Sequence, residues 1–344
     1  MKTYDIMGSW TINTSCNFKC PYCHPILHDE VAPGSGSKKE IEKIVQFFDK
    51  TKKTWLIIIT GGEPFLYPNF IELCKKLSKK HYISIITNLS SDLAYRFCKE
   101  INPKRVGWIN CSLHITERER LGLNKDVIKK IKLLKKHKFR INVTQVMWPP
   151  AIEKFDGIFE YFKKHGIVIK PIGFKGIYNG KKYPDSYKKR EREKMEYYLN
   201  IVSKNYRKEK NNPYFFEVKP KIDAKELAKK YADVGNKNKK VTNIFRGNLS
   251  FKGIPCLTGK TFVRIDDKGD IIRCLGSRTK LGNIYKGRIK LFKRIKKCKS
   301  KICICYFDGI RHALGSPKIV KLPVSNKIIS KISLILSRIK KRIS

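Results

Sequence analysis

Apolar residues in the first half of the chain follow two alternating patterns. Runs of consecutive apolar residues predict buried strands, and apolar residues three or four positions apart predict amphipathic helices. The predicted strands cover residues 10–14, 55–60, 81–86, 106–111, 141–147 and 167–172. The predicted helices cover residues 38–50, 70–80, 91–100, 117–137 and 155–165. Strands that alternate with helices indicate a parallel α/β sheet with right-handed crossovers.

The second half of the chain has a different pattern. Residues 183–210 predict a charged helix with Met195, Tyr198, Leu199 and Val202 as its apolar stripe. Residues 261–265 and 270–273 predict a hairpin that turns at Gly269, and a helix is expected over residues 291–297. We therefore divide the chain into a core (1–174), a basic helical linker (175–252), a small hairpin/helix domain (253–310) and a basic amphipathic C-terminal helix (318–344). The linker is interpreted either as a lid over a substrate or as solvated filler.

Cysteine usage indicates a metal or redox site. Most of the 11 cysteines among the 344 residues lie in two clusters. The N-terminus has no apolar signal-peptide core, and no apolar run is long enough to cross a membrane. Clustered cysteines without a secretory signal are typical of a reducing compartment, so a cytoplasmic protein is expected.

The net charge of +47 is large and uneven, because residues 176–344 hold 45 Lys and Arg against 13 Asp and Glu. Such a field attracts nucleic acid or an anionic membrane. However, 59 of the 76 basic residues are Lys, which the codon bias of an AT-rich genome also explains. A nucleic-acid partner is therefore an alternative that the sequence does not favour.

The first cysteine cluster is the most informative stretch of the chain. Cys16, Cys20 and Cys23 are spaced C-x3-C-x2-C, directly after the first predicted strand. Cysteine thiolates hold iron–sulfur clusters, and three ligands for four irons would leave one iron open. The alternatives are cysteines grouped by chance or a zinc site, to which His24 or His28 could contribute.

A second motif, Gly61-Gly62-Glu63-Pro64, follows the strand over residues 55–60. Glycines let the backbone approach a ligand closely and leave amide N–H groups to bond it, and the carboxylate can accept hydrogen bonds from an ammonium group. Polar residues follow later strands too, at Asn88, Ser112 and Gln145. The carboxyl ends of parallel strands carry the chemistry in βα barrels. Alternatively, Asn88 caps a helix and Ser112 only fills a strand end.

Together these motifs resemble the radical S-adenosylmethionine (radical SAM) superfamily, whose core is a partial (β/α)6 barrel. The resemblance implies that Cys16, Cys20 and Cys23 hold a catalytic [4Fe–4S] cluster and that SAM chelates its open iron. Tyr22 stands at the aromatic position of the family motif. By the same resemblance, the residues that contact SAM are Tyr22, Gly61, Gly62, Glu63, Pro64, Asn88, Ser112 and Gln145.

The second cysteine cluster resembles the SPASM/Twitch type of C-terminal domain. Cys256, Gly269 and Cys274 follow its C-x12-G-x4-C pattern, and Cys298, Cys303 and Cys305 come after a Leu-Gly-Asn-Ile segment. The resemblance implies one auxiliary [4Fe–4S] cluster, with one of the last three cysteines left free. Zinc is the alternative metal. The spacing after Cys298 departs from the full seven-cysteine pattern of the family.

The resemblance also implies the reaction. One electron from the cluster cleaves SAM to methionine and a 5′-deoxyadenosyl radical, which abstracts hydrogen from a substrate C–H. Oxidation, epimerisation or rearrangement would follow. A one-electron donor such as flavodoxin or ferredoxin is the implied partner.

The substrate is less constrained. No leader-binding domain is expected before the first predicted strand, which favours a small molecule or sugar. Peptide or protein modification, RNA modification and a non-catalytic, zinc-stabilised, nucleic-acid-binding protein are the alternatives.

Residues 318–344 contain eight basic residues and no acidic residue. Apolar residues recur on one helical face from Ile328 to Ile343, with Lys and Arg opposite. A basic amphipathic helix is typical of membrane-surface binding, so a peripheral place on the inner membrane face is expected, unless the helix docks on the protein itself.

Overall fold

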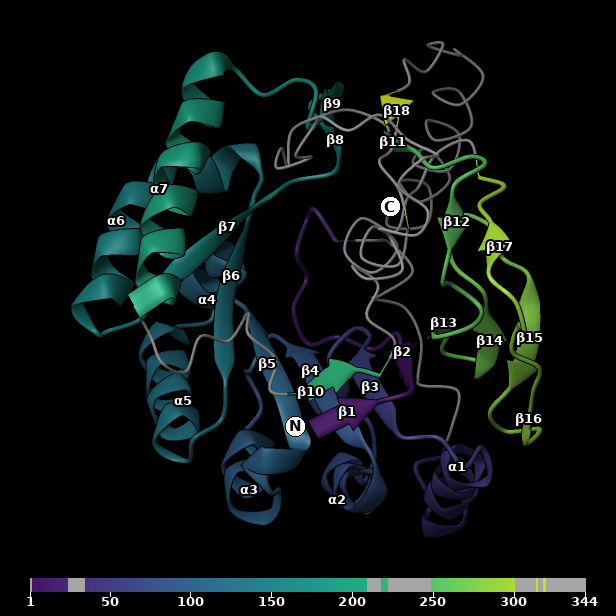
Figure 1. Ribbon diagram of the computed structural model, residues 1–344. Coiled ribbons are helices and arrows are strands. Elements are labelled where there is room, and N and C mark those ends of the chain that lie inside the picture. The colour runs from purple at the N-terminus through teal and green to yellow at the C-terminus, as the bar shows by residue number, and fades with distance from the viewer. Residues whose placement is uncertain are drawn as a thin grey trace, which may run out of the picture.

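Six parallel strands, adjacent in chain order, form the centre of the fold. The computed structural model describes residues 2–23, 35–208, 218–221, 249–300, 314 and 318–319. The strands lie in an open curve (Figure 1). They are β2 (Ile6–Thr11), β3 (Trp55–Thr60), β4 (Tyr82–Thr87), β5 (Val106–Ser112), β6 (Ile141–Met147) and β7 (Ile169–Gly173). The α/β class and the partial barrel predicted from the sequence are confirmed.

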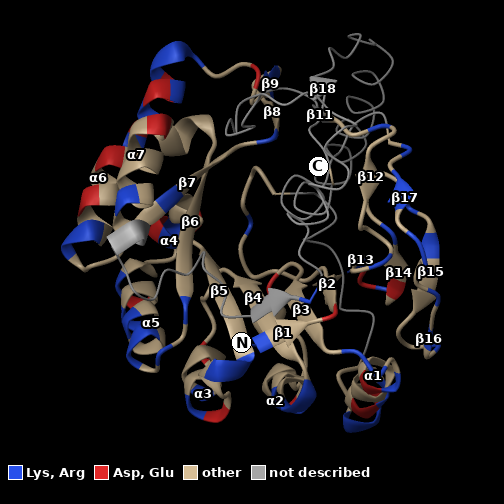
Figure 2. Ribbon diagram, viewed as in Figure 1, with Lys and Arg blue, Asp and Glu red and all other residues tan. Residues whose placement is uncertain are grey.

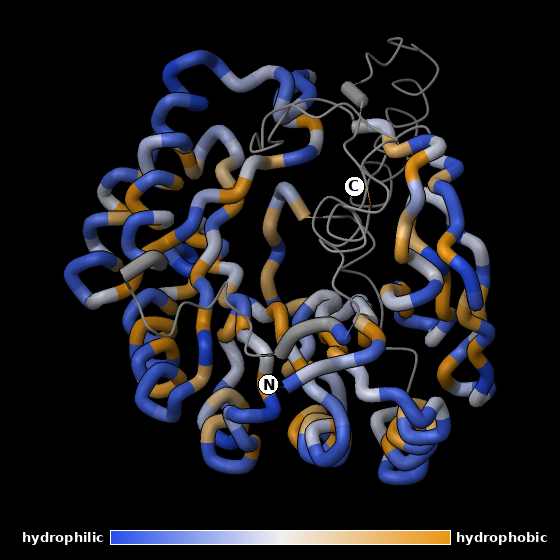
Figure 3. Tube along the Cα trace, in the orientation of Figure 1, coloured by the Kyte–Doolittle hydropathy of each residue, from blue (hydrophilic) through white to orange (hydrophobic). Residues whose placement is uncertain are grey.

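The helices between these strands lie on the outer side of the curve (Figure 1). Figure 3 shows hydrophobic and hydrophilic residues interleaved along them, as expected for helices that bury one face. They are α1 (Lys38–Lys50), α2 (Phe70–Lys80), α3 (Leu93–Glu100), α4 (Ile115–Arg120), α5 (Asn124–Lys136) and α6 (Pro149–Lys164), with short 3-10 turns at Pro64–Leu66 and Pro103–Arg105.

The predicted elements of the core agree closely with the observed ones, with three corrections. The helix expected over residues 155–165 begins at Pro149, because proline is favoured in the first turn of a helix. The strand expected over residues 10–14 runs instead from Ile6 to Thr11, so Ile12–Thr14 already belong to the loop. The single helix expected over residues 117–137 is two helices, α4 and α5. They separate at Gly122, whose positive φ of 67° does not continue an α-helix.

The C-terminal hairpin continues the same sheet. Strand β13 (Phe262–Ile265) pairs in parallel with β2, and β14 (Asp270–Ile272) pairs antiparallel with β13. The sheet then extends through β15 (Lys280–Asn283) to β16 (Arg288–Ile289), giving ten strands in all among the described residues. The hairpin is therefore joined to the core at β2, the strand that leads into the first cysteine cluster.

The helix expected over residues 291–297 is wrong. Lys296–Lys297 form strand β17, antiparallel to β12 (Pro255–Cys256). The N–H of Phe292 donates to the carbonyl oxygen of Gly259 at 2.8 Å. The Arg273 guanidinium lies 5.5 Å from the centroid of the Phe292 ring. These tertiary contacts hold the segment extended and override its helical pattern.

The linker contains a hairpin, β8 (Gly176–Tyr178) with β9 (Lys181–Tyr183), followed by α7 (Lys189–Lys208). Met195, Tyr198 and Val202 are buried, as the predicted apolar stripe requires, and Leu199 is half-buried. The remaining short strands are β1 (Lys2–Tyr4), paired with β10 (Val218–Pro220), and β11 (Leu249–Ser250), paired with β18 (Lys318–Ile319).

The C-terminal segment is described only at its start. Lys318 and Ile319 are in strand β18 rather than in a helix. The amphipathic pattern from Ile328 onward lies outside the described residues. In the part of the chain that is described, no helix is long and apolar enough to cross a membrane. Figure 2 shows Lys and Arg on the outer helices and along β15 and β17.

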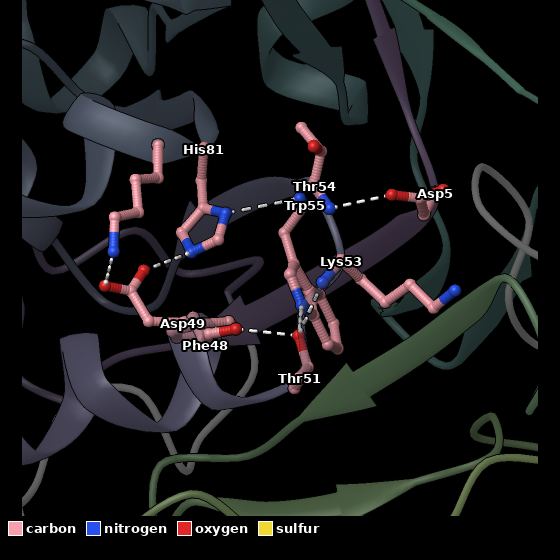
Figure 4. Close-up of polar contacts among 9 residues, drawn as sticks. Asp5, Phe48, Asp49, Thr51, Lys53, Thr54, Trp55 and His81 are labelled. Atoms are coloured by element: carbon pink, nitrogen blue, oxygen red, sulfur yellow. Dashed lines mark hydrogen bonds and ion pairs between the residues drawn. The ribbon is translucent and has the colours of Figure 1, made fainter.

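A buried histidine lies at the amino end of the parallel strands. His81 is 2% exposed, and its Nε2 lies 3.2 Å from the Asp49 carboxylate at the end of α1. The N–H of Trp55 points at the other ring nitrogen at 3.4 Å (Figure 4). Burial lowers the pKa of His81, and Asp49 only partly opposes this effect. The neutral imidazole therefore joins α1 to the starts of β3 and β4.

Candidate functional site

The first cysteine cluster lies on the loop that follows β2. Cys20 is buried, and Cys16 and Cys23 are half-buried. The N–H of Cys23 donates to the carbonyl oxygen of Cys20 at 3.0 Å, and the N–H of Phe18 donates to Cys16 Sγ at 3.4 Å. These contacts make a tight turn that brings the three thiols together.

The three thiols are the donor type that holds an iron–sulfur cluster. Burial raises the pKa of Cys16 to about 11 and that of Cys20 to about 12, and the neighbouring cysteines add to both shifts. His24 and His28, the further ligands that a zinc site could use, lie outside the described residues. Each cysteine of a [4Fe–4S] cluster binds a different iron, so its sulfurs stand further apart than the ligands of one zinc ion.

The Gly61-Gly62-Glu63-Pro64 loop packs directly on this loop. The N–H of Gly62 donates to Asn13 O at 3.1 Å, and the N–H of Glu63 donates to Ser15 O at 2.8 Å. The Asn13 side chain donates back to the Glu63 carbonyl oxygen at 3.0 Å. The glycines therefore permit two loops to approach each other. The Gly62 N–H is not available to a ligand, contrary to the expectation from sequence.

The Glu63 side chain is fully buried, with 0% exposure. Its carboxylate accepts hydrogen bonds from Thr87 Oγ1 at 2.7 Å, from the Phe65 N–H at 3.0 Å and from the Asn88 N–H at 2.6 Å. Burial raises its pKa, and these hydrogen bonds oppose that effect. The carboxylate thus joins the ends of β3 and β4, and the buried Pro64 begins the 3-10 turn behind it.

Asn88 faces the cysteine loop. Its Nδ2 donates to Asn17 Oδ1 at 3.0 Å and lies 3.9 Å from Cys16 Sγ. Its Oδ1 accepts the Ser90 N–H at 2.9 Å. The predicted site residue is therefore beside the cysteines, where it orders the loop.

Aromatic side chains form one wall of the site. The Tyr22 hydroxyl lies 2.8 Å from His114 Nδ1, and the two rings are stacked with centroids 5.8 Å apart. Trp148 and Phe174 lie on other sides of Tyr22, with centroids at 5.2 and 6.5 Å. Burial lowers the pKa of His114 to about 4, so its ring is neutral at neutral pH.

Gln145 and Ser112 complete the set predicted from sequence. Gln145 is fully buried, and its Oε1 accepts the N–H of Ile115 at the start of α4 at 3.1 Å. Ser112 is half-buried, and its Oγ accepts a 3.4 Å hydrogen bond from the Asn110 amide. Both lie at the carboxyl ends of their strands, and Gln145 is engaged within the protein.

Comparison with known proteins agrees with this geometry. Residues 10–176, which include the cysteine loop, the Gly-Gly-Glu-Pro loop and strands β3–β7, match the family described as the Radical SAM superfamily. Residues 10–176 therefore match a radical SAM domain, over just under half of the chain.

The chain is similar to several curated proteins. It is 33% identical over 107 residues to a "Probable GTP 3',8-cyclase" of Thermoplasma volcanium, covering 30% of this chain and 31% of that protein. A protein of the same name from Methanococcus maripaludis is 25% identical over 174 residues, covering 48% and 57%. The chain thus spans between about a third and just over half of the length of these relatives.

Solved structures share the fold beyond the radical SAM domain. anSMEcpe with bound AdoMet has a TM-score of 0.52 at 17% identity, over 82% of this chain and 75% of that chain. SuiB of Streptococcus suis, bound to its precursor peptide SuiA, has a TM-score of 0.51 at 16% identity, over 83% and 63%. At such identities the likeness establishes the fold alone.

The second cysteine cluster lies partly outside the described residues. Cys256 is buried, and Cys274 and Cys298 are half-buried; Cys303 and Cys305 are not among the described residues. The N–H of Cys298 donates to Ile254 O at 2.8 Å, which places it beside the strand that contains Cys256. Burial raises the pKa of Cys256, which the nearby Cys298 raises further. Cys256 and Cys298 are therefore brought together.

Two residues that the sequence patterns did not single out, Glu117 and Arg118, contact the cysteine loop of the radical SAM domain. They lie on α4, about a hundred positions after the loop, and belong to no recognised spacing motif. The available signal was two charged residues placed shortly after a buried strand. The isolated cysteines Cys74, Cys98 and Cys111 are buried in the core.

Proposed function

We propose that this protein is a radical SAM enzyme in which Cys16, Cys20 and Cys23 hold a [4Fe–4S] cluster and SAM occupies its open iron. The observation that carries the proposal is the attachment of the cysteine loop to the Gly-Gly-Glu-Pro loop at the carboxyl ends of β2 and β3. Two separately recognised motifs form one unit there, joined by contacts such as that between Asn13 and Glu63, which are 50 positions apart.

The bound cluster and SAM would supply the chemistry. Cys16, Cys20 and Cys23 would hold the cluster, which, once reduced by an external one-electron donor, would supply the electron for reductive cleavage of SAM and for hydrogen abstraction from a substrate C–H. The protein positions these groups and excludes water. Tyr22, Trp148 and Phe174 provide an apolar wall for that purpose.

A small molecule is the preferred substrate class. The curated relatives of this chain are named for a reaction of GTP. The net charge of +47 suits an anionic ligand. Nucleoside triphosphates are therefore the first compounds to test, followed by sugar phosphates.

A peptide is the second candidate. SuiB, which shares the fold over 83% of this chain, is described in complex with a precursor peptide. In this case the linker that contains β8, β9 and α7 would contact the peptide.

We further propose that Cys256, Cys274 and Cys298, with Cys303 or Cys305, bind one auxiliary [4Fe–4S] cluster of the SPASM/Twitch type. The proximity of Cys256 and Cys298 supports this assignment. The auxiliary cluster would accept an electron from the substrate radical or bind the substrate.

The test is SAM cleavage by anaerobically reconstituted protein with dithionite. We expect 5′-deoxyadenosine from the wild type and none from the Cys16→Ala/Cys20→Ala/Cys23→Ala variant. Turnover in D2O with each nucleoside triphosphate, then with peptides, would identify substrates by acceleration over the uncoupled rate. A wild type that binds iron but never cleaves SAM would contradict the proposal.

A further inference from the structure

Two consecutive side chains of α4 contact the middle of the cysteine loop. Glu117 Oε2 accepts the backbone N–H of Lys19 at 3.0 Å. The guanidinium carbon of Arg118 lies 5.4 Å from the centroid of the Phe18 ring. Phe18 and Lys19 are two of the three residues between Cys16 and Cys20. Helix α4 therefore contacts the segment that fixes the spacing of two cluster ligands.

Both side chains are buried, at 5% exposure for Glu117 and 0% for Arg118. Burying a charge is costly unless partners compensate it. Glu117 is compensated, because Arg120 Nη2 lies 2.9 Å from its Oε2. Although burial acts to raise its pKa, Arg120 and the Lys19 N–H lower it overall. Glu117 is therefore a carboxylate at neutral pH.

Arg118 is only partly compensated. Its Nε donates to the carbonyl oxygen of Leu113 at 2.5 Å. Neither Nη1 nor Nη2 has a well-formed hydrogen bond in the described part of the chain, although both are buried, and the Cys111 thiol and the Asp126 and Glu63 carboxylates only partly offset the effect of burial, which lowers the Arg118 pKa. Phe18 itself is 1% exposed, so the ring and the guanidinium shield each other from water. A buried charge that its partners compensate incompletely is weak evidence for a role in stability. An apolar side chain would fill the same space with a smaller free-energy cost of burial.

The two charges also have an electrostatic consequence. An arginine stays protonated even when buried, so Arg118 contributes a fixed positive charge behind the cysteine loop. Charges act over longer distances in the protein interior than in water. The potential of an iron–sulfur cluster depends on the net charge and hydrogen bonds around it. A reduced cluster carries one more negative charge, which Arg118 stabilises and Glu117 disfavours.

We propose that Glu117 and Arg118 are positioning residues that hold Lys19 and Phe18 in the cluster-binding conformation of the loop, and that their opposite charges shift the reduction potential of the cluster in opposite directions. The proposal rests on the proposed function in so far as it requires a cluster on Cys16, Cys20 and Cys23.

The first experiment is an EPR-monitored redox titration of the cluster on Cys16, Cys20 and Cys23. Arg118→Met should lower the ratio of reduced to oxidised cluster at a fixed potential by roughly tenfold, about 59 mV for a one-electron couple. Arg118→Lys, which keeps the charge, should restore most of this loss. Glu117→Gln keeps an oxygen acceptor for the Lys19 N–H but removes the charge, so it should raise the ratio.

Arg105→Met is the matched control. Arg105 also stacks on an aromatic ring, 5.3 Å from the centroid of Tyr82, but at the opposite end of β5. Arg105→Met changes the net charge of the protein by the same amount as Arg118→Met does, and it should leave the redox titration of the cluster unchanged. Shifts of the same sign in Arg118→Met and Glu117→Gln, or an equal shift in Arg105→Met, would overturn the electrostatic part. If Arg118→Met does not fold, the Glu117→Gln variant alone tests the electrostatic part: its reduction potential should be higher than that of the wild type, and a lower or equal potential would overturn this part.

The second experiment needs no cluster. Hydrogen exchange of the Lys19 amide, followed by NMR in the apo protein, should be faster in Glu117→Ala than in the wild type and near wild type in Glu117→Gln. Alkylation of Cys16 and Cys20 should also be faster in Glu117→Ala than in the wild type. Equal exchange and alkylation in all three proteins would overturn the positioning part. A wild type that binds no iron would instead defeat the proposed function and leave this result standing.

Discussion

A Cβ atom on Gly62 would lie 2.1 Å from the carbonyl oxygen of Ser15. Real Cβ atoms do not approach a backbone oxygen so closely, so any side chain at this position must push the cysteine loop away from β3. The same displacement would break the hydrogen bond from the Glu63 N–H to Ser15.

We therefore predict that Gly62→Ala impairs iron incorporation. Reconstitution should yield less iron on Cys16, Cys20 and Cys23 than in the wild type, with the fold retained by circular dichroism. The matched control is Gly157→Ala in α6, where a Cβ meets nothing within 4 Å. That control should raise the free energy of unfolding by about 0.5–1 kcal/mol, because alanine favours a helix. Full iron loading of Gly62→Ala would contradict the packing argument.

Thr87 provides a second test. Its hydroxyl donates to the buried Glu63 carboxylate at 2.7 Å. Thr87→Val keeps the shape but leaves the carboxylate without one donor, so the free energy of unfolding should fall by about 2 kcal/mol. Thr87→Ser, which keeps the hydroxyl, should lose much less. Urea denaturation of the apo proteins measures both, and equal losses would indicate that packing rather than the hydrogen bond matters.

His81 predicts a pH dependence of stability. Burial lowers its pKa in the folded protein below the ordinary value of 6.5, so the unfolded chain binds a proton more readily. The contribution of neutral His81 to the free energy of unfolding is therefore fully present above pH 6.5. This contribution is lost as the pH falls below that value toward the pKa of His81 in the folded protein.

Thermal unfolding of apo wild type and His81→Gln at pH 7.5 and 5.5 measures this effect. The wild type should lose more stability on acidification than the variant does. If the wild type and His81→Gln differ in stability by the same amount at both pH values, His81 does not titrate between them.

The expected binding of the C-terminal segment to a membrane surface concerns residues that the structure does not describe. The basic amphipathic pattern from Ile328 to Ile343 predicts binding to anionic vesicles. Full-length protein should co-sediment with liposomes that contain phosphatidylglycerol, and a 1–316 truncation should not. Neutral phosphatidylcholine liposomes are the control, and equal binding by both proteins would remove this segment from consideration.

The sequence predicted the parts of the site that local patterns encode. The apolar runs placed the six strands, and the spacing of Cys16, Cys20 and Cys23 drew attention to the loop that follows β2. Local patterns could not reveal the contact between Glu117 and Lys19, because the two residues are 98 positions apart. Nor could they show that Gly62 serves a contact between two loops rather than a ligand. The extended course of residues 291–297 depends on pairing with β12, which no local pattern contains.

The central claim is that the two cysteine clusters bind two iron–sulfur clusters, of which the first activates SAM. The most direct measurement is the iron content of anaerobically reconstituted wild type and of the Cys16→Ala/Cys20→Ala/Cys23→Ala variant. We predict about eight irons for the wild type and about four for the variant, and SAM cleavage by the wild type alone. A variant without iron would contradict the auxiliary cluster, and a wild type without iron would contradict the radical mechanism itself.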